Sequence, residues 1–137
     1  MDFRKAFGTV KAMETEGFDL QFGPDTVVRI ARAGGANVRY ENAMRKHSEP
    51  YRRAIAAGTL DDDLAQKLWQ RIYAESIVLG WSGVEIDDEP IPYTVDNAIR
   101  LFNELPEFWR IVREEATKLA NFRQEDTAEM GKASPTL

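Results

Sequence analysis

The spacing of apolar residues along the chain predicts a protein made mostly of helices. Between residues 64 and 77, apolar side chains form two adjacent rows at i,i+4 spacing, which is typical of a helix with a broad buried face. Shorter stripes predict helices over residues 1–16, 37–46, 48–58 and 94–105, and a last helix that begins at Pro106. These stripes also predict the hydrophobic core, which we expect to contain Leu64, Leu68, Trp69, Ile72, Tyr73, Ile77, Ile99, Phe102, Phe108, Val112 and Leu119. If Trp69 is buried there, its replacement by Ala should cost about 3–5 kcal/mol.

One segment near the N-terminus has the two-residue period of a β-hairpin. Residues 18–22 alternate strictly between apolar and polar, residues 23–25 have the composition of a turn, and residues 26–32 are rich in β-branched side chains. An isolated hairpin is marginally stable, so this one must lie on the helices or pair with another chain. The expected fold class is therefore mainly α: a small helical domain with a short N-terminal β-hairpin at about 18–32.

After the longest helix, the pattern predicts a loop, and near the C-terminus it predicts a tail. We expect Gly80 to end that helix as its C-cap, and residues 81–93, with two prolines and an acidic cluster, to form a loop. From Arg123 onward the chain is polar. The expected organisation is a single domain over residues 1–122, followed by a flexible polar C-terminal tail over 123–137.

Composition places the chain among globular proteins and removes most catalytic chemistry. Its 137 residues are 43% apolar and 30% charged, with no cysteine and a single histidine, His47. Disulfides, thiol catalysis and thiolate metal sites are thereby excluded, and no apolar run approaches the roughly 18 residues of a membrane span. We therefore expect no enzyme activity, no catalytic, cofactor-binding or metal-binding residues, no cofactor, no secretory signal and no membrane partner.

Three polar or aromatic features have a plainer interpretation than a functional site. The acidic runs at residues 61–63 and 87–89 lack the spacing of a calcium loop, so we interpret them as a helix start and a solvated loop. His47 cannot form a catalytic triad with its chain neighbours and is expected to be exposed near a helix end. Trp81 directly follows the longest helix, and we interpret it as an aromatic cover for that helix end.

Charge is unevenly distributed and points to a protein partner. The net charge is −5, yet residues 28–53 carry seven basic and two acidic side chains. Nucleic-acid binding is not expected, because the acidic remainder would repel phosphate and no groove-reading motif accompanies the basic segment. Electrostatic pairing between protein surfaces is the favoured interpretation. The candidate partner-binding residues are Arg39, Arg45, Lys46, Arg52 and Arg53.

The second half of the chain carries an ordered succession of motifs. Gly80-Trp81-Ser82-Gly83-Val84 is followed by an acidic loop, by Ile91-Pro92-Tyr93-Thr94, by a segment ending in Leu105-Pro106, and by Ala120-Asn121-Phe122. This succession resembles that of the tail assembly chaperones of long-tailed bacteriophages, and the resemblance extends over roughly residues 18–122. The residues of the family pattern are Gly80, Trp81, Gly83, Ile91, Pro92, Tyr93 and Pro106.

The resemblance implies a non-enzymatic role: binding and solubilising the tape-measure protein and helping to recruit tail-tube subunits. It implies action in the cytoplasm of the bacterial host and absence from the mature virion, and it leaves a homo-oligomer open. A structural virion component, such as a head–tail adaptor or tail-completion protein, and a small regulatory protein-binding domain are the alternatives. The resemblance also implies a longer product made by −1 frameshifting, for which Gly131-Lys132 is the candidate position, the alternative being an ordinary tail.

Overall fold

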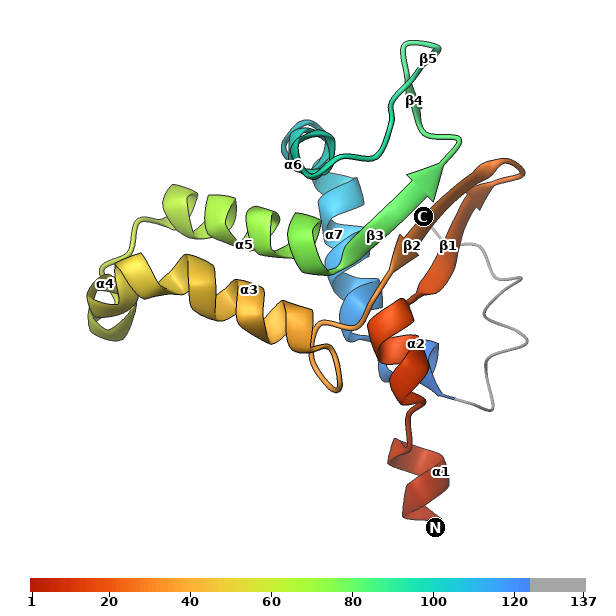
Figure 1. The fold of residues 1–137 in the computed structure, drawn as a ribbon, viewed down its shortest axis with the longest axis horizontal. Coiled ribbons are helices and arrows are strands. Elements are labelled where there is room, and N and C mark those ends of the chain that lie inside the picture. The colour runs from red at the N-terminus through yellow and green to blue at the C-terminus, as the bar shows by residue number, and fades with distance from the viewer. Residues whose placement is uncertain (124–137) are drawn as a thin grey trace.

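Three antiparallel strands form a sheet toward one side of the fold, and two long helices extend away from it to the left in Figure 1. The structure is a computed structural model, and it describes residues 1–123. The strands are β1 (Phe18–Gly23), β2 (Thr26–Ile30) and β3 (Val78–Ser82), in the order β1-β2-β3. Leu20 pairs with Val28, and Val28 pairs with Trp81. The hairpin expected at about 18–32 is confirmed as β1 and β2.

The third strand replaces the helix end and part of the loop expected after residue 77. The expectation that Gly80 is a C-cap is wrong, because the preceding helix ends at Ser76 and Gly80 lies within β3. The apolar run 77–79 suits a helix or a strand equally well, and β2 decides between them by offering an edge to pair. β3 therefore covers one edge of the hairpin, and β1 is left at the edge of the sheet.

Helices and 3₁₀ turns make up most of the described chain. They are α1 (Phe3–Phe7), α2 (Lys11–Glu16), α3 (Val38–Ser48), η1 (Glu49–Tyr51), α4 (Arg52–Ala57), α5 (Asp62–Ser76), α6 (Val95–Glu104), α7 (Pro106–Thr117) and η2 (Leu119–Phe122). Side-chain caps begin four of them. Asp2 caps α1, Asn37 accepts from the N–H of Tyr40, Asp61 from that of Leu64, and Thr94 from that of Asn97. The helix expected over 1–16 is instead two short helices, separated at residues 8–10.

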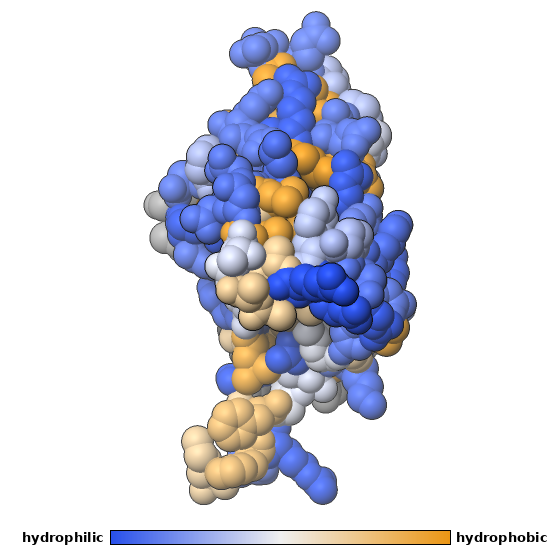
Figure 2. All heavy atoms as spheres, turned by 90° about the vertical axis from the view of Figure 1, so that its left-hand side faces the viewer, coloured by the Kyte–Doolittle hydropathy of each residue, from blue (hydrophilic) through white to orange (hydrophobic). Residues whose placement is uncertain are grey.

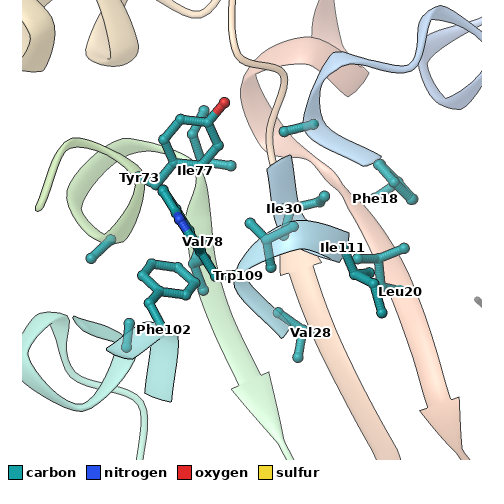
Figure 3. Packing of buried hydrophobic residues seen from close by; sticks show 14 of the residues in the cluster. Phe18, Leu20, Val28, Ile30, Tyr73, Ile77, Val78, Phe102, Trp109 and Ile111 are labelled. Atoms are coloured by element: carbon teal, nitrogen blue, oxygen red, sulfur yellow. The ribbon is translucent and has the colours of Figure 1, made fainter. Parts of the chain in front are cut away.

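The core lies where α5, α6 and α7 meet the sheet (Figure 3). Ile30 of β2 and Ile111 of α7 belong to one buried cluster, shown in Figure 3, so the core joins the sheet to α7. Trp109 connects this layer to the other helices, with its ring centroid 4.7 Å from that of Phe102 and 5.2 Å from that of Tyr73. Such tilted and edge-on contacts are the favourable geometries for aromatic rings.

The predicted core is confirmed for the residues nearest the sheet. Ile72, Tyr73, Ile77, Phe102 and Val112 are buried, whereas Leu64, Leu68, Ile99, Phe108 and Leu119 are half-buried. The prediction for Trp69 is wrong, because its side chain is 43% exposed. α3 and α5 extend together away from the sheet, with α4 at their tip (Figure 1), so Trp69 lies on a stretch of α5 that fewer elements cover.

The segment between β3 and α6 is more regular than the expected loop. It contains β4 (Glu85–Ile86) and β5 (Glu89–Pro90), which pair as a small hairpin. Asp87 and Asp88 connect them with φ angles of 52° and 64°, and two positive φ angles are what a type I′ turn requires. Short polar side chains tolerate positive φ angles better than most other side chains do, so two aspartates can form the turn.

A helix-dominated α+β domain with a short antiparallel hairpin at its N-terminal end is thus the observed fold class. Within residues 1–123, none of the helices has both the length and the apolar content needed to span a membrane. Except for Arg123, the tail expected over 123–137 lies outside the described residues, as does the Gly131-Lys132 position.

Candidate functional site

An apolar groove lies at the end of the molecule farthest from the sheet, between α3, α4 and α5. Its cavity has a volume of about 310 Å³ and includes Trp69. We name it the Trp69 groove, and its lining residues are Met44, Ser48, Ile55, Leu60, Ala65, Leu68, Trp69 and Ile72. Figure 2 faces this end of the molecule and shows hydrophobic side chains gathered in its middle, framed by hydrophilic ones.

The local sequence explains why this groove stays open. Gly58 turns the chain out of α4 with a φ of 70°, and Asp61 then caps α5, so the chain reverses within a few residues. α4 is short and carries no buried residue, and it therefore covers the space between α3 and α5 incompletely. Ile55 on α4 remains 46% exposed and Trp69 on α5 remains 43% exposed. Two large apolar side chains consequently face solvent beside the same groove.

A second cavity adjoins the groove through Trp69. Its volume is about 260 Å³, and we name it the aromatic pocket, lined by Tyr40, Gln66, Trp69, Tyr73, Trp109 and Arg113. The guanidinium carbon of Arg113 lies 4.8 Å from the centre of the Trp109 ring, which is a cation–π distance. Burial raises the pKa of Tyr73 to about 12, and the neighbouring Tyr40 adds to this rise. Both phenols are therefore neutral hydrogen-bonding groups at neutral pH.

The structure separates the five basic residues predicted to bind a partner. Arg45 and Lys46 lie in the last turn of α3 and Arg52 and Arg53 begin α4, so four exposed cations surround the tip that carries the Trp69 groove. Arg39 lies at the opposite end of α3, where it lines a different cavity with Glu75 and Tyr93. The basic rim proposed from the sequence is thus four residues at one place and a fifth elsewhere.

Acidic side chains flank the groove at the start of α5. Asp61, Asp62 and Asp63 are exposed and directly follow Leu60, which is part of the lining. They complement the positive end of the α5 dipole, as the sequence predicts. Within residues 1–123, no three histidine, aspartate or glutamate side chains are arranged to hold a metal ion. The groove therefore has a basic side at α3 and α4 and an acidic side at the start of α5.

Three residues of the family pattern, Trp81, Ile91 and Tyr93, form a closed structural contact. The indole N–H of Trp81 donates to the carbonyl oxygen of Ile91 at 2.8 Å, and the Trp81 and Tyr93 rings meet edge-on at 5.2 Å. The Tyr93 hydroxyl lies 2.8 Å from the carbonyl oxygen of Ala74 and 2.6 Å from that of Val78. We name this contact the Trp81 clamp, because it ties the segment before α6 to the junction of α5 and β3.

Three other residues of the pattern have local structural roles. Gly83 has a φ of 74°, and a side chain there would collide with the Asp25 carbonyl oxygen. Pro106 occupies the first turn of α7, where a missing N–H costs nothing. Pro92 contributes its carbonyl oxygen, which accepts from the Asn97 side chain at 2.9 Å. The residues of the family pattern therefore stabilise the fold, and none of them lines the Trp69 groove.

His47 is not the exposed residue that the sequence suggests. Its Nε2 lies 2.7 Å from a carboxylate oxygen of Glu75, and its side chain is 17% exposed. Arg71 contacts the other Glu75 oxygen at 3.9 Å. The histidine thus ties the end of α3 to α5 and helps to hold the two helices that form the walls of the groove.

Sequence reasoning missed the apolar lining of the groove. The signal was present in Ile55, which is apolar within a short alanine-rich helix, and in the width of the apolar face on α5. That face is wider than α3 alone can cover. An overly wide apolar stripe could therefore have indicated a docking surface in place of a fuller core.

Fold and groove together define a small helix-dominated α+β domain with an open apolar surface at one end. A family model described as the YdaY prophage protein matches residues 35–133, which include α3 to α7 and therefore both the groove and the Trp81 clamp. The chain belongs to this family and is phage-derived. No curated protein and no solved structure matches it.

Proposed function

We propose that this protein is a phage tail assembly chaperone, which holds amphipathic helices of the tape-measure protein in the Trp69 groove. This proposal rests on the half-exposed Trp69, which lies between the apolar groove and the aromatic pocket. Amphipathic helices bind in grooves of this kind by inserting apolar anchors at i, i+3, i+4 and i+7 spacing. Half-exposed tryptophans beside a pocket are typical centres of binding energy in protein interfaces.

The charges around the groove suit an amphipathic helix with mixed charge on its polar face. Four cations lie on the α3 and α4 side and three aspartates begin α5. Exposed charges of this kind act mainly on association rate and register and are screened by salt. The contact on each helix is small, so a long target would be held by several copies with moderate affinity each. Moderate affinity also permits release when tube subunits assemble.

The proposal places the protein in the cytoplasm of the bacterial host and outside the finished virion. Recruitment of tail-tube subunits belongs to the same proposal and rests on the resemblance to tail assembly chaperones. The phage origin supports this class, and the open groove supports a role in binding protein over catalysis.

Co-expression with the tape-measure protein encoded by the same prophage tests the proposal. The wild-type chain should raise the soluble fraction of that protein, and Trp69→Ala should lose most of this effect. Leu105→Ala is the matched control, because Leu105 is 42% exposed and lines neither the groove nor the pocket. Equal rescue by wild type and Trp69→Ala would refute the role of the groove. Mass spectrometry of purified particles should find no copies, and stoichiometric copies would instead establish a structural virion component.

A further inference from the structure

The N-terminal helix α1 is a hydrophobic arm whose two phenylalanine rings are exposed among the described residues 1–123. None of its five residues is buried: Phe3 is 68% exposed and Phe7 is 61% exposed. The two rings nevertheless meet edge-on at 5.4 Å, and the Asp2 side chain caps the helix by accepting from the N–H of Arg4 at 2.9 Å. Figure 2 shows this arm as a separate hydrophobic projection below the rest of the molecule. The arm is thus an anchor formed before binding.

The base of the arm is fixed to the body. The N–H of Val10 donates to the carbonyl oxygen of Phe122 at 2.7 Å, and Arg123 donates to that of Ala6 at 2.8 Å. Three residues, 8–10, link α1 to α2, and such a link spans at most about 10 Å. α1 and the α3–α4–α5 tip lie at different extremities of the molecule (Figure 1). The arm therefore cannot enter the Trp69 groove of its own chain.

The arm and the groove are complementary in chemistry. Phe3 and Phe7 are four residues apart and lie on one face of a helix, which is the spacing that groove-bound helices use. The groove offers Met44 and Trp69, whose sulfur and ring make favourable contacts with phenyl groups. Between the two phenylalanines the arm carries Arg4 and Lys5, and the groove is flanked by the aspartates at residues 61–63. The apolar surfaces match, and the two cations of the arm complement the acidic side of the groove at the start of α5, not its basic side at α3 and α4.

We propose that the arm of one copy docks into the Trp69 groove of a second copy. The contact is head-to-tail, because arm and groove are different surfaces at different ends of the molecule. It uses the same groove as the proposed function but does not depend on the tape-measure protein. In the absence of a client, the arm covers the apolar groove and protects it from aggregation. A helix of the tape-measure protein, the proposed client, then has to displace the arm. Docking of the arm therefore regulates access to the groove.

Sedimentation velocity across a concentration series tests this proposal without any client. Wild type should self-associate, and Phe3→Ser/Phe7→Ser should weaken association by at least about tenfold, which corresponds to about 1.4 kcal/mol. Ile55→Asp should have the same effect from the groove side, and Ile55 is exposed enough for the variant to fold. Leu105→Ser is the control and should associate as wild type does.

Mixing the two weakened variants gives the sharper result. The arm variant retains a groove and the Ile55→Asp variant retains an arm, so together they should form a 1:1 heterodimer although each alone is monomeric. A monomeric wild type would overturn the proposal, and so would self-association that neither variant changes. If the monomeric wild type instead co-sediments with anionic lipid vesicles, and Phe3→Ser/Phe7→Ser abolishes this, the arm binds a lipid surface and not a second copy. Heterodimer formation without rescue of the tape-measure protein would leave this inference intact and remove the chaperone.

Discussion

Two tryptophans, Trp69 on α5 and Trp81 on β3, have opposite environments. Trp81 is half-buried, its indole N–H donates to a carbonyl oxygen, and its ring packs on Tyr93. Trp69 is 43% exposed and separates two cavities. The first residue belongs to the succession of motifs that carries the family resemblance, and the second does not. The comparison teaches that the recognisable pattern maintains the fold, whereas the surface available to a partner lies elsewhere.

The largest expected effect on stability comes from breaking the Trp81 clamp. Trp81→Ala removes a half-buried ring and leaves the Ile91 carbonyl oxygen without its donor, so we expect the free energy of unfolding to fall by about 3 kcal/mol. Urea denaturation measures this value. A loss below about 1 kcal/mol would show that the clamp is not what holds the segment before α6.

The hydroxyl of Tyr93 should account for part of that effect. Tyr93→Phe leaves two carbonyl oxygens, those of Ala74 and Val78, without this donor, and we expect a loss of about 1.5 kcal/mol. Tyr51→Phe is the control, since the Tyr51 hydroxyl has no hydrogen bond within the described residues. An equal change in the two variants would contradict the role given to the Tyr93 hydroxyl.

Alkaline pH probes the boundary between the core and the aromatic pocket. Burial raises the pKa of Tyr73 to about 12 in the folded protein, above the usual value near 10 of the unfolded chain. The stabilising contribution is therefore complete below pH 10 and is lost as the pH rises from about 10 to 12. We expect a loss of about 1 kcal/mol at pH 11, which Tyr73→Phe should reduce. Thermal unfolding of wild type and Tyr73→Phe, followed from pH 10 to pH 12, measures the loss of stability in each.

Trp69→Ala should change stability less than any of these. The ring is exposed on one side, so we expect a loss of no more than about 1 kcal/mol, in place of the 3–5 kcal/mol that full burial would imply. Urea denaturation beside Trp81→Ala gives the direct comparison. Equal losses in the two variants would mean that Trp69 is part of the core and that the groove is closed in solution.

Charge reversal at the tip should be the smallest effect on stability. Arg45→Glu and Arg52→Glu change exposed residues, and the Arg52–Glu49 pair at 3.5 Å is a surface contact of little worth. We expect the free energy of unfolding to change by less than about 0.5 kcal/mol, while client binding weakens and loses salt dependence. Arg39→Glu is the matched control, because Arg39 lies away from the groove. Binding that responds equally to all three changes would contradict the separation of the basic residues.

Capping residues and the two-residue period predicted the helix starts and the hairpin from short stretches of sequence. The third strand and the exposure of Trp69 depend instead on how distant elements pack. Asn37, Asp61 and Thr94 act within a few residues of themselves, so their caps follow from the sequence. The run 77–79 and Trp69 depend on partners distant in the chain. Whether Ile77-Val78-Leu79 continues a helix or pairs with β2, and whether α3 covers Trp69, are settled only when these elements meet. Buried and docking residues share one hydrophobic pattern, so the sequence shows the wide apolar face of α5 but not which part of it stays open as the groove.

We propose that the Trp69 groove is the surface that binds the helices of the tape-measure protein. Isothermal titration of purified protein with a tape-measure segment that forms an amphipathic helix tests it most directly, with wild type, Trp69→Ala and Leu105→Ala compared at equal salt. We expect Trp69→Ala to weaken binding by at least about tenfold and Leu105→Ala to leave it unchanged. Equal affinity of wild type and Trp69→Ala for that segment would show that the groove does not bind it.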